Sequence, residues 1–215
     1  MAQHREDGPE SLGPPPEDLH ERPLRLSAYR DLAYRVYWLD ENPKYFGKEK
    51  KWRFDDPLGE YGVMYASTSD LGACAETLLP QPGALAHTAV YGGSIPVSGT
   101  NIAAHGLAVV TLANPLQYFD LSGGALALTG ADASIATGPW RISQLWSRAL
   151  FTHPAQPDGL LYRGRRDPSR ISLAIHERAS PNATAAPMGR LSESQHKGLL
   201  AEFIRRYHVV IVPSP

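Results

Sequence analysis

The chain has 215 residues, of which 42% are hydrophobic and 20% are charged, a composition typical of one globular domain with a sizeable core. The formal net charge of −1 excludes a general electrostatic attraction to nucleic acid or anionic membranes, and the single cysteine, Cys74, excludes an intramolecular disulfide and a cysteine-cluster metal site. Because there is no apolar run of transmembrane length and no signal-peptide pattern, we expect a cytoplasmic protein.

The N-terminal part divides into a tail and a first strand. Residues 1–23 contain five prolines and alternating charges, and they cannot bury enough apolar surface to become ordered. We therefore expect a disordered tail over 1–23 and a single domain over 24–215. The aromatic stretch 29–39 predicts a strand that carries Arg35. An arginine in a core strand must pair or face a cleft, because burying an unpaired guanidinium is costly; an edge-strand arginine that reaches solvent is the alternative.

The next segment combines a strand over 61–66, a hydroxyl-rich corner over 67–69 and a short helix that ends at a proline. The helix carries an apolar stripe with the spacing i, i+3, i+4, i+7 and i+8: Leu71, Cys74, Ala75, Leu78 and Leu79. Glu76 lies off this stripe, Arg53 precedes the strand and Tyr65 is near its end. These three side chains can converge where strand meets helix. Taken singly, each also has a simpler interpretation. Glu76 can be a solvated side chain on the flank of the helix, Arg53 a surface cation, and Tyr65 a half-buried packing residue of the strand.

The rest of the chain predicts short strands with few helices between them. Strands are expected over 107–112, 117–121, 158–162, 171–175 and 209–212, with a further short candidate over 88–91. Helices are expected over 140–151 and 194–207, one short helix and a turn within 122–137, and a polar loop over 180–192. Strands that follow one another without helices between them favour an α+β fold with small antiparallel or mixed sheets over a doubly wound sheet.

Several motifs, in order over roughly 30–178, together resemble the RES domain family. They are Tyr34-Arg35, Arg53-Phe54, Met64-Tyr65, Ala75-Glu76, FDDP at 54–57, DLSG at 120–123, GADA at 130–133 and PDGLLYRGRRDPSR at 157–170. Members of this family are often toxins of toxin–antitoxin pairs, have an ADP-ribosyltransferase-like fold and cleave NAD at the nicotinamide–ribose bond. The resemblance implies two small mixed or antiparallel sheets around a cleft, flanked by short helices, with NAD between the sheets.

The resemblance also implies a catalytic set of Arg35, Arg53, Tyr65 and Glu76. The forked donors of Arg35 and Arg53 suit the diphosphate of NAD, and the ring of Tyr65 suits the nicotinamide. Glu76 would bind the ribose hydroxyls and favour the cation that develops on the ribose. NAD is then a substrate, inorganic phosphate a possible co-substrate, and no cofactor or metal is expected. A cognate antitoxin protein is the implied partner, with no nucleic acid and no membrane.

The chain departs from the family pattern at a basic turn. Gly164 falls where the family has its serine, and Arg166 falls where a histidine is common. Gly164 and Arg165 remain candidate NAD-binding residues, because the charges and backbone N–H groups of the turn could hold phosphate. Ser169 and Ser172 are nearby but do not stand at the matching position. Three interpretations stay open: an NAD-cleaving toxin that uses water or phosphate, a catalytically impaired module that binds NAD or another nucleotide, and a protein ADP-ribosyltransferase.

Overall fold

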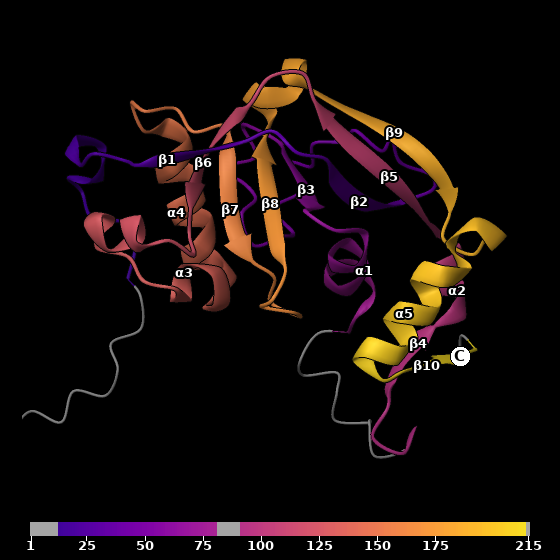
Figure 1. Cartoon of the computed structure of the whole chain (residues 1–215). Coiled ribbons are helices and arrows are strands. Elements are labelled where there is room, and N and C mark those ends of the chain that lie inside the picture. Colours follow the sequence, from indigo (N-terminus) through magenta and orange to yellow (C-terminus); the bar gives the residue numbers. More distant parts are fainter. Residues whose placement is uncertain (1–12, 81–90, 214–215) are drawn as a thin grey trace, which may run out of the picture.

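The computed structural model describes residues 13–80 and 91–213 and has a mixed α+β fold (Figure 1). The strands are β1 (Leu26–Tyr29), β2 (Ala33–Trp38), β3 (Val63–Ser67), β4 (Ile95–Ser98), β5 (His105–Leu112), β6 (Leu116–Asp120), β7 (Gly159–Arg163), β8 (Ile171–His176), β9 (Ala183–Arg190) and β10 (Val209–Val212). The α-helices are α1 (Asp70–Leu78), α2 (Gly99–Ala103), α3 (Ser134–Thr137), α4 (Trp140–Thr152) and α5 (Lys197–Tyr207). Short 3-10 turns are η1 (Leu19–Glu21), η3 (Gly124–Thr129), η4 (Glu177–Asn182) and η5 (Ser194–His196).

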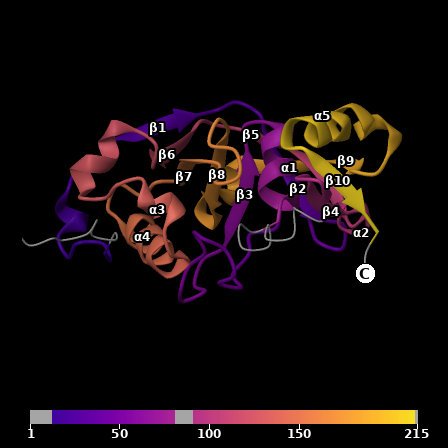
Figure 2. The ribbon, with the colours of Figure 1, turned by 90° about the horizontal axis from the view of Figure 1, so that it is seen from below.

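Two unequal sheets build the fold. Eight strands form one mixed sheet in the order β1-β6-β7-β8-β3-β2-β5-β9, and β10 pairs with β4 in a separate two-stranded sheet. Figure 1 shows the large sheet arching over α1, with α3 and α4 on one side and α5 with the small sheet on the other. The view from below in Figure 2 places β3 and α1 between these two groups of helices. The expected α+β class is confirmed.

A row of polar side chains crosses the centre of the large sheet on strands β7, β8 and β3. In the antiparallel register, Ser172 of β8 lies opposite Tyr162 of β7 on one side and opposite Ser67 of β3 on the other. Directly opposed residues of neighbouring strands present their side chains on the same face of a sheet. Tyr162, Ser172 and Ser67 therefore share one face, at the point where β3 leads into α1.

Helix α1 begins and packs as its sequence predicts. The Ser69 hydroxyl accepts a hydrogen bond from the Gly72 N–H at 3.1 Å and so caps the helix N-terminus. The apolar face, which includes Cys74, belongs to a core cluster shared with Leu107 of β5 and Phe203 of α5. A Cβ atom on Gly72 would lie 2.3 Å from the Ser67 hydroxyl oxygen, so any other residue there would require that hydroxyl to move.

Part of the N-terminal segment is ordered, which corrects the expected tail. Leu19 in η1 is 3% exposed and belongs to a core cluster with Trp146. The Trp146 indole N–H also donates a hydrogen bond to the Gly13 carbonyl at 3.0 Å. The expectation of disorder is therefore wrong for residues 13–23, because contacts from distant parts of the chain supply the apolar burial that the local composition lacks. Residues 1–12 lie outside the described residues.

Other boundaries also differ from those predicted. The strand expected over 29–39 is confirmed as β2, but it begins at Ala33, and Tyr29 belongs to β1, which pairs with β6 instead. The loop expected over 180–192 contains the edge strand β9. Most residues of β9 are exposed, and the strand contains Pro187 and Gly189, so its sequence is typical of a loop. The segment 122–137 forms the 3-10 turn η3 and the short helix α3, in agreement with the expected helix and turn, whereas β4 and α2 were not predicted. The candidate strand over 88–91 lies almost wholly outside the described residues.

The remaining predicted elements are confirmed to within a few residues. These are the strands β3, β5, β6, β7, β8 and β10 and the helices α1, α4 and α5. None of the helices in the described part of the chain is long and apolar enough to cross a membrane.

Candidate functional site

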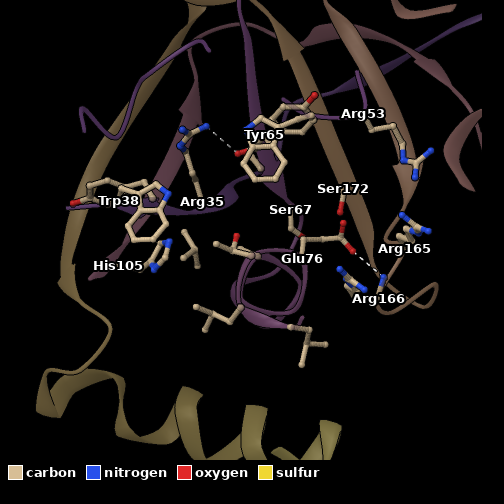
Figure 3. Close-up of a pocket in the computed structure, with 18 of the residues that line it drawn as sticks. Arg35, Trp38, Arg53, Tyr65, Ser67, Glu76, His105, Arg165, Arg166 and Ser172 are labelled. Atoms are coloured by element: carbon tan, nitrogen blue, oxygen red, sulfur yellow. Dashed lines mark hydrogen bonds between the residues drawn. The ribbon is translucent and has the colours of Figure 1, made fainter. Parts of the chain in front are cut away.

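A cavity of about 670 Å³ opens where β2, β3, α1 and the turn after β7 meet. Its volume lies within the range of about 300–1,000 Å³ that is usual for small-molecule sites. Arg35, Arg53, Tyr65 and Glu76 all line it, and so does Arg165. Figure 3 shows these side chains arranged around a common space, with Arg35 and Arg53 on opposite sides of Tyr65. The four residues expected to form a catalytic set therefore lie together.

Arg35 enters the cavity from β2. Its Nη1 donates a long hydrogen bond of 3.4 Å to the Tyr65 carbonyl, and its Nε is buried without a hydrogen-bond partner among the described residues. Burial lowers the pKa of Arg35, against an opposing effect of the Glu41 carboxylate. A guanidinium that is buried and only partly bonded can accept an anionic ligand at little further desolvation cost.

Arg53 lies in the segment before β3 and is 8% exposed. Its Nη1 donates hydrogen bonds to the Gly138 carbonyl at 2.6 Å and to the Ser143 hydroxyl at 3.0 Å, whereas its buried Nη2 has no partner in the described structure. Burial and then the positive charge of Arg165 lower the pKa of Arg53 to about 10. One side of the guanidinium is thus fixed by the protein, and the other is left for a ligand.

Tyr65 uses its hydroxyl within the protein. The hydroxyl donates to Asp55 Oδ1 at 2.9 Å and accepts from the Phe54 N–H at 2.9 Å. Burial raises the pKa of Tyr65 well above its usual value, and the neighbouring Asp55 carboxylate raises it further. The hydroxyl is therefore a structural group that holds the segment around Arg53 against β3, and the ring is what Tyr65 presents to the cavity.

Glu76 extends from the last turn of α1 toward the turn after β7. Its Oε1 accepts a hydrogen bond from the Arg166 backbone N–H at 3.0 Å. Burial raises the pKa of Glu76, opposed by that hydrogen bond and by the charge of Arg166. The carboxylate is thus oriented by a backbone group that does not depend on which side chain stands at position 166.

The basic turn 164–170 is closed by its own hydrogen bonds. The Gly164 N–H donates to the Arg170 carbonyl at 2.8 Å, and the Arg170 N–H donates to the Asp167 carbonyl at 2.9 Å. Gly164 is not itself a lining residue, but a Cβ atom there would lie 3.0 Å from Glu76 Oε1. Arg165 and Arg166 do line the cavity. The turn therefore places a glycine directly beside the carboxylate.

Helix α5 anchors this turn from outside the cavity. The Tyr207 hydroxyl donates a hydrogen bond to Asp167 Oδ2 at 2.7 Å, and Arg206 Nε donates to the same oxygen at 3.3 Å. Helix α5 also shares a core cluster with α1. The same helix therefore contacts both α1, which carries Glu76, and the turn that orients the Glu76 carboxylate.

Sequence reasoning missed several aromatic residues that line the cavity. Trp38 is 44% exposed and its ring lies 4.0 Å from that of His105, and Trp52 is 49% exposed with its ring 6.1 Å from that of Trp140. Large exposed aromatic rings in a cavity are suited to stacking with a planar ligand. Their sequence signal was weak, because a tryptophan at a strand end or in a charged loop has no distinctive spacing.

The chain is similar to known proteins in three comparisons. The model of the RES domain family matches residues 25–196. A protein of Sinorhizobium fredii named Probable toxin y4kH is 29% identical over 100 residues, which cover 46% of this chain and 78% of that protein. A chain in the crystal structure of the M. tuberculosis MbcT–MbcA toxin–antitoxin complex superposes with a TM-score of 0.56 at 13% identity, covering 86% of this chain and 98% of that one.

The structural match confirms the expected ADP-ribosyltransferase-like fold. The family match extends from β1 to η5 and so includes every strand and helix that lines the cavity in the described structure. The order of the motifs, the α+β architecture and the match over most of the sequence lead to one conclusion: the chain belongs to the RES domain family.

Proposed function

We propose that this protein is an NAD-cleaving enzyme that splits the bond between nicotinamide and ribose. One observation carries the proposal: two partly bonded guanidinium groups and an acidic side chain from separate segments line a single cavity. Buried polar atoms without partners are uncommon, and each one calls for an explanation such as an absent ligand. Arg35 Nε and Arg53 Nη2 are two such atoms, and an anionic ligand would satisfy both.

The diphosphate of NAD suits the side of the cavity that carries Arg53 and Arg165. The charge of Arg165 lowers the pKa of Arg53, so these two cations are close enough to repel each other. An anion bound between them would replace that repulsion with two attractive interactions. Arg35 would contact the ligand from the opposite side of Tyr65.

The ribose next to the reacting bond suits Glu76. Loss of nicotinamide leaves a ribosyl group with the character of an oxocarbenium ion, as in glycoside hydrolysis, and a fixed carboxylate stabilises that charge as it develops. Nicotinamide leaves as a neutral molecule from a cationic ring, so no strong acid has to protonate it. The chain then needs to hold the dinucleotide in place, exclude water from the ring and present Glu76 to the ribose hydroxyls.

The relatives support a toxin role. One curated relative is named a probable toxin, and the structural neighbour comes from a toxin–antitoxin complex. Consumption of NAD would make this chain harmful to its own cell, and a cognate antitoxin would then be its partner. Induced expression in a bacterium should lower cellular NAD before growth stops, and Glu76→Ala should remove both effects. Growth arrest with normal NAD would contradict this role.

The enzymatic test is release of nicotinamide from NAD by the purified protein, with and without inorganic phosphate. The proposal predicts release by the natural chain and by Glu21→Ala, a control in which an exposed glutamate of η1 is removed, and at least a hundredfold less release by Glu76→Ala. A phosphate requirement would assign phosphate as the acceptor, and labelled protein would assign a protein acceptor. Binding of NAD without any release would favour the impaired binding module.

A further inference from the structure

The hydroxyl of Ser172 is buried, and no backbone carbonyl of the described residues accepts a hydrogen bond from it. Ser172 is 1% exposed, and no hydrogen bond of standard geometry reaches its Oγ within the described residues, although the Tyr162 phenol is close enough to interact with it. The other three serines that are buried in the described part of the chain, Ser67, Ser143 and Ser147, all donate to backbone carbonyls at 2.7–2.9 Å. Ser172 is therefore the exception, and it lines the cavity.

The position of Ser172 relates it to Glu76. Its strand register puts it on the same face as Tyr162, and the pKa of Tyr162 is raised by burial and then by the nearby Glu76 carboxylate. Figure 3 shows the Ser172 hydroxyl and the Glu76 carboxylate directed toward the same space. A donor and a carboxylate that face one space suit a ligand hydroxyl, which donates to the carboxylate and accepts from the serine.

Position 164 of the turn provides no hydroxyl next to Glu76. Position 164 is a glycine, and a Cβ atom there would lie 2.9 Å from the Asp167 carbonyl oxygen and 3.0 Å from Glu76 Oε1. A side chain at 164 would require the backbone of the turn to move. The hydroxyl next to Glu76 comes instead from the neighbouring strand, β8.

We propose that Ser172 is a substrate-binding residue that donates a hydrogen bond to a hydroxyl of the nicotinamide ribose. This assignment rests on the proposed NAD-cleaving function. A phosphate is the less suitable ligand at this point, because its negative charge would lie beside the Glu76 carboxylate. Ser172 and Glu76 together would fix the ribose from two sides, one as donor and one as acceptor.

Ser172→Ala tests the assignment. The substitution should lower kcat/KM for NAD about tenfold, which corresponds to about 1.4 kcal/mol. The melting temperature should fall less than for a buried serine that donates to a backbone carbonyl, because no hydrogen bond of standard geometry reaches the removed hydroxyl within the described structure. The matched control is Ser147→Ala, which removes an equally buried hydroxyl that donates to the Phe54 carbonyl at 2.7 Å and does not line the cavity. It should lower the melting temperature and leave kcat/KM unchanged.

NAD analogues that lack the 2′- or the 3′-hydroxyl of the nicotinamide ribose separate binding from a general effect. If Ser172 contacts one of these hydroxyls, the loss caused by Ser172→Ala should disappear with the analogue that lacks it and persist with the other. An unchanged kcat/KM for NAD, or an equal loss with both analogues, would overturn the assignment. Absence of nicotinamide release by the natural chain would instead overturn the proposed function, and this assignment with it.

Discussion

Gly164 offers a sharp test of how the site is built. The position aligns with a serine in the family pattern, and the alignment alone predicts that Gly164→Ser restores a missing group. The structure predicts the opposite. A side chain at 164 meets the Asp167 carbonyl oxygen at 2.9 Å, which is backbone and cannot swing aside, and it meets Glu76 Oε1 at 3.0 Å. Normal contacts are several tenths of an ångström longer, so the turn would have to shift.

The expected magnitude follows from this crowding. Overpacking of a well-packed site costs about 1–3 kcal/mol. For a chain of this size, each kcal/mol lowers the melting temperature by about 2–4 °C. The shift would also disturb the 3.0 Å hydrogen bond from the Arg166 N–H that orients Glu76, and we expect at least a tenfold loss of nicotinamide release.

Thermal unfolding and nicotinamide release should be measured on Gly164→Ser and Gly164→Ala together. Both variants carry the added Cβ atom, so both should lose stability and activity to a similar extent. Gly198→Ala in α5 is the control, because a Cβ atom there meets no atom within 4 Å and alanine favours the helix. A Gly164→Ser variant that melts like the natural chain and releases nicotinamide faster would refute this reasoning.

Three further predictions follow from single groups in the cavity. Tyr65→Phe should lower the free energy of unfolding by about 1–3 kcal/mol, because Asp55 loses a buried donor, while KM for NAD changes little; denaturant titration with unchanged stability would contradict this. Arg53→Lys should raise KM about tenfold or more, since an ammonium cannot replace the forked donors, and steady-state kinetics with an unchanged KM would argue against a diphosphate contact. Burial raises the pKa of Glu76, so acidification should inactivate the enzyme at a pH above 4.5, the ordinary glutamate value; the pH–rate profile measures this, and a midpoint at or below 4.5 would be inconsistent with it.

The same pKa shift has a consequence for stability. The folded chain holds the Glu76 proton more tightly than the unfolded chain does. Its contribution to stability is therefore present below pH 4.5 and is lost as the pH rises through the folded-state pKa. Glu76→Gln should accordingly stabilise the protein at neutral pH, and the gain should shrink in acid. Stability curves that stay parallel at all pH values would show that the carboxylate is not desolvated.

The segment from β3 to α1 could be predicted because its signals are local. A serine cap and a 3.6-residue apolar period define α1 without reference to the rest of the chain. Arg35 and Glu76 come together because β2 pairs with β3 and α1 packs beneath both strands. Local sequence patterns predict neither the strand pairing nor this packing. The resemblance to a family supplied that link.

Other features had no usable local signal. Strand β9 lies at the edge of the sheet with most of its residues exposed, so it lacks the alternation that marks a half-buried strand. No sequence pattern predicts a partner for the Tyr65 hydroxyl, whereas in the fold this hydroxyl donates a hydrogen bond to Asp55. Ser172 was noted only as a hydroxyl at a non-matching position, because its approach to Glu76 comes from strand register rather than from sequence distance.

The most direct test of the account is a crystal structure of Glu76→Gln with NAD bound. We predict NAD in the 670 Å³ cavity, with its diphosphate between Arg53 and Arg165 and its nicotinamide ribose within hydrogen-bond distance of the side chain at position 76. NAD bound outside this cavity, or bound with its diphosphate away from both guanidinium groups, would contradict the account.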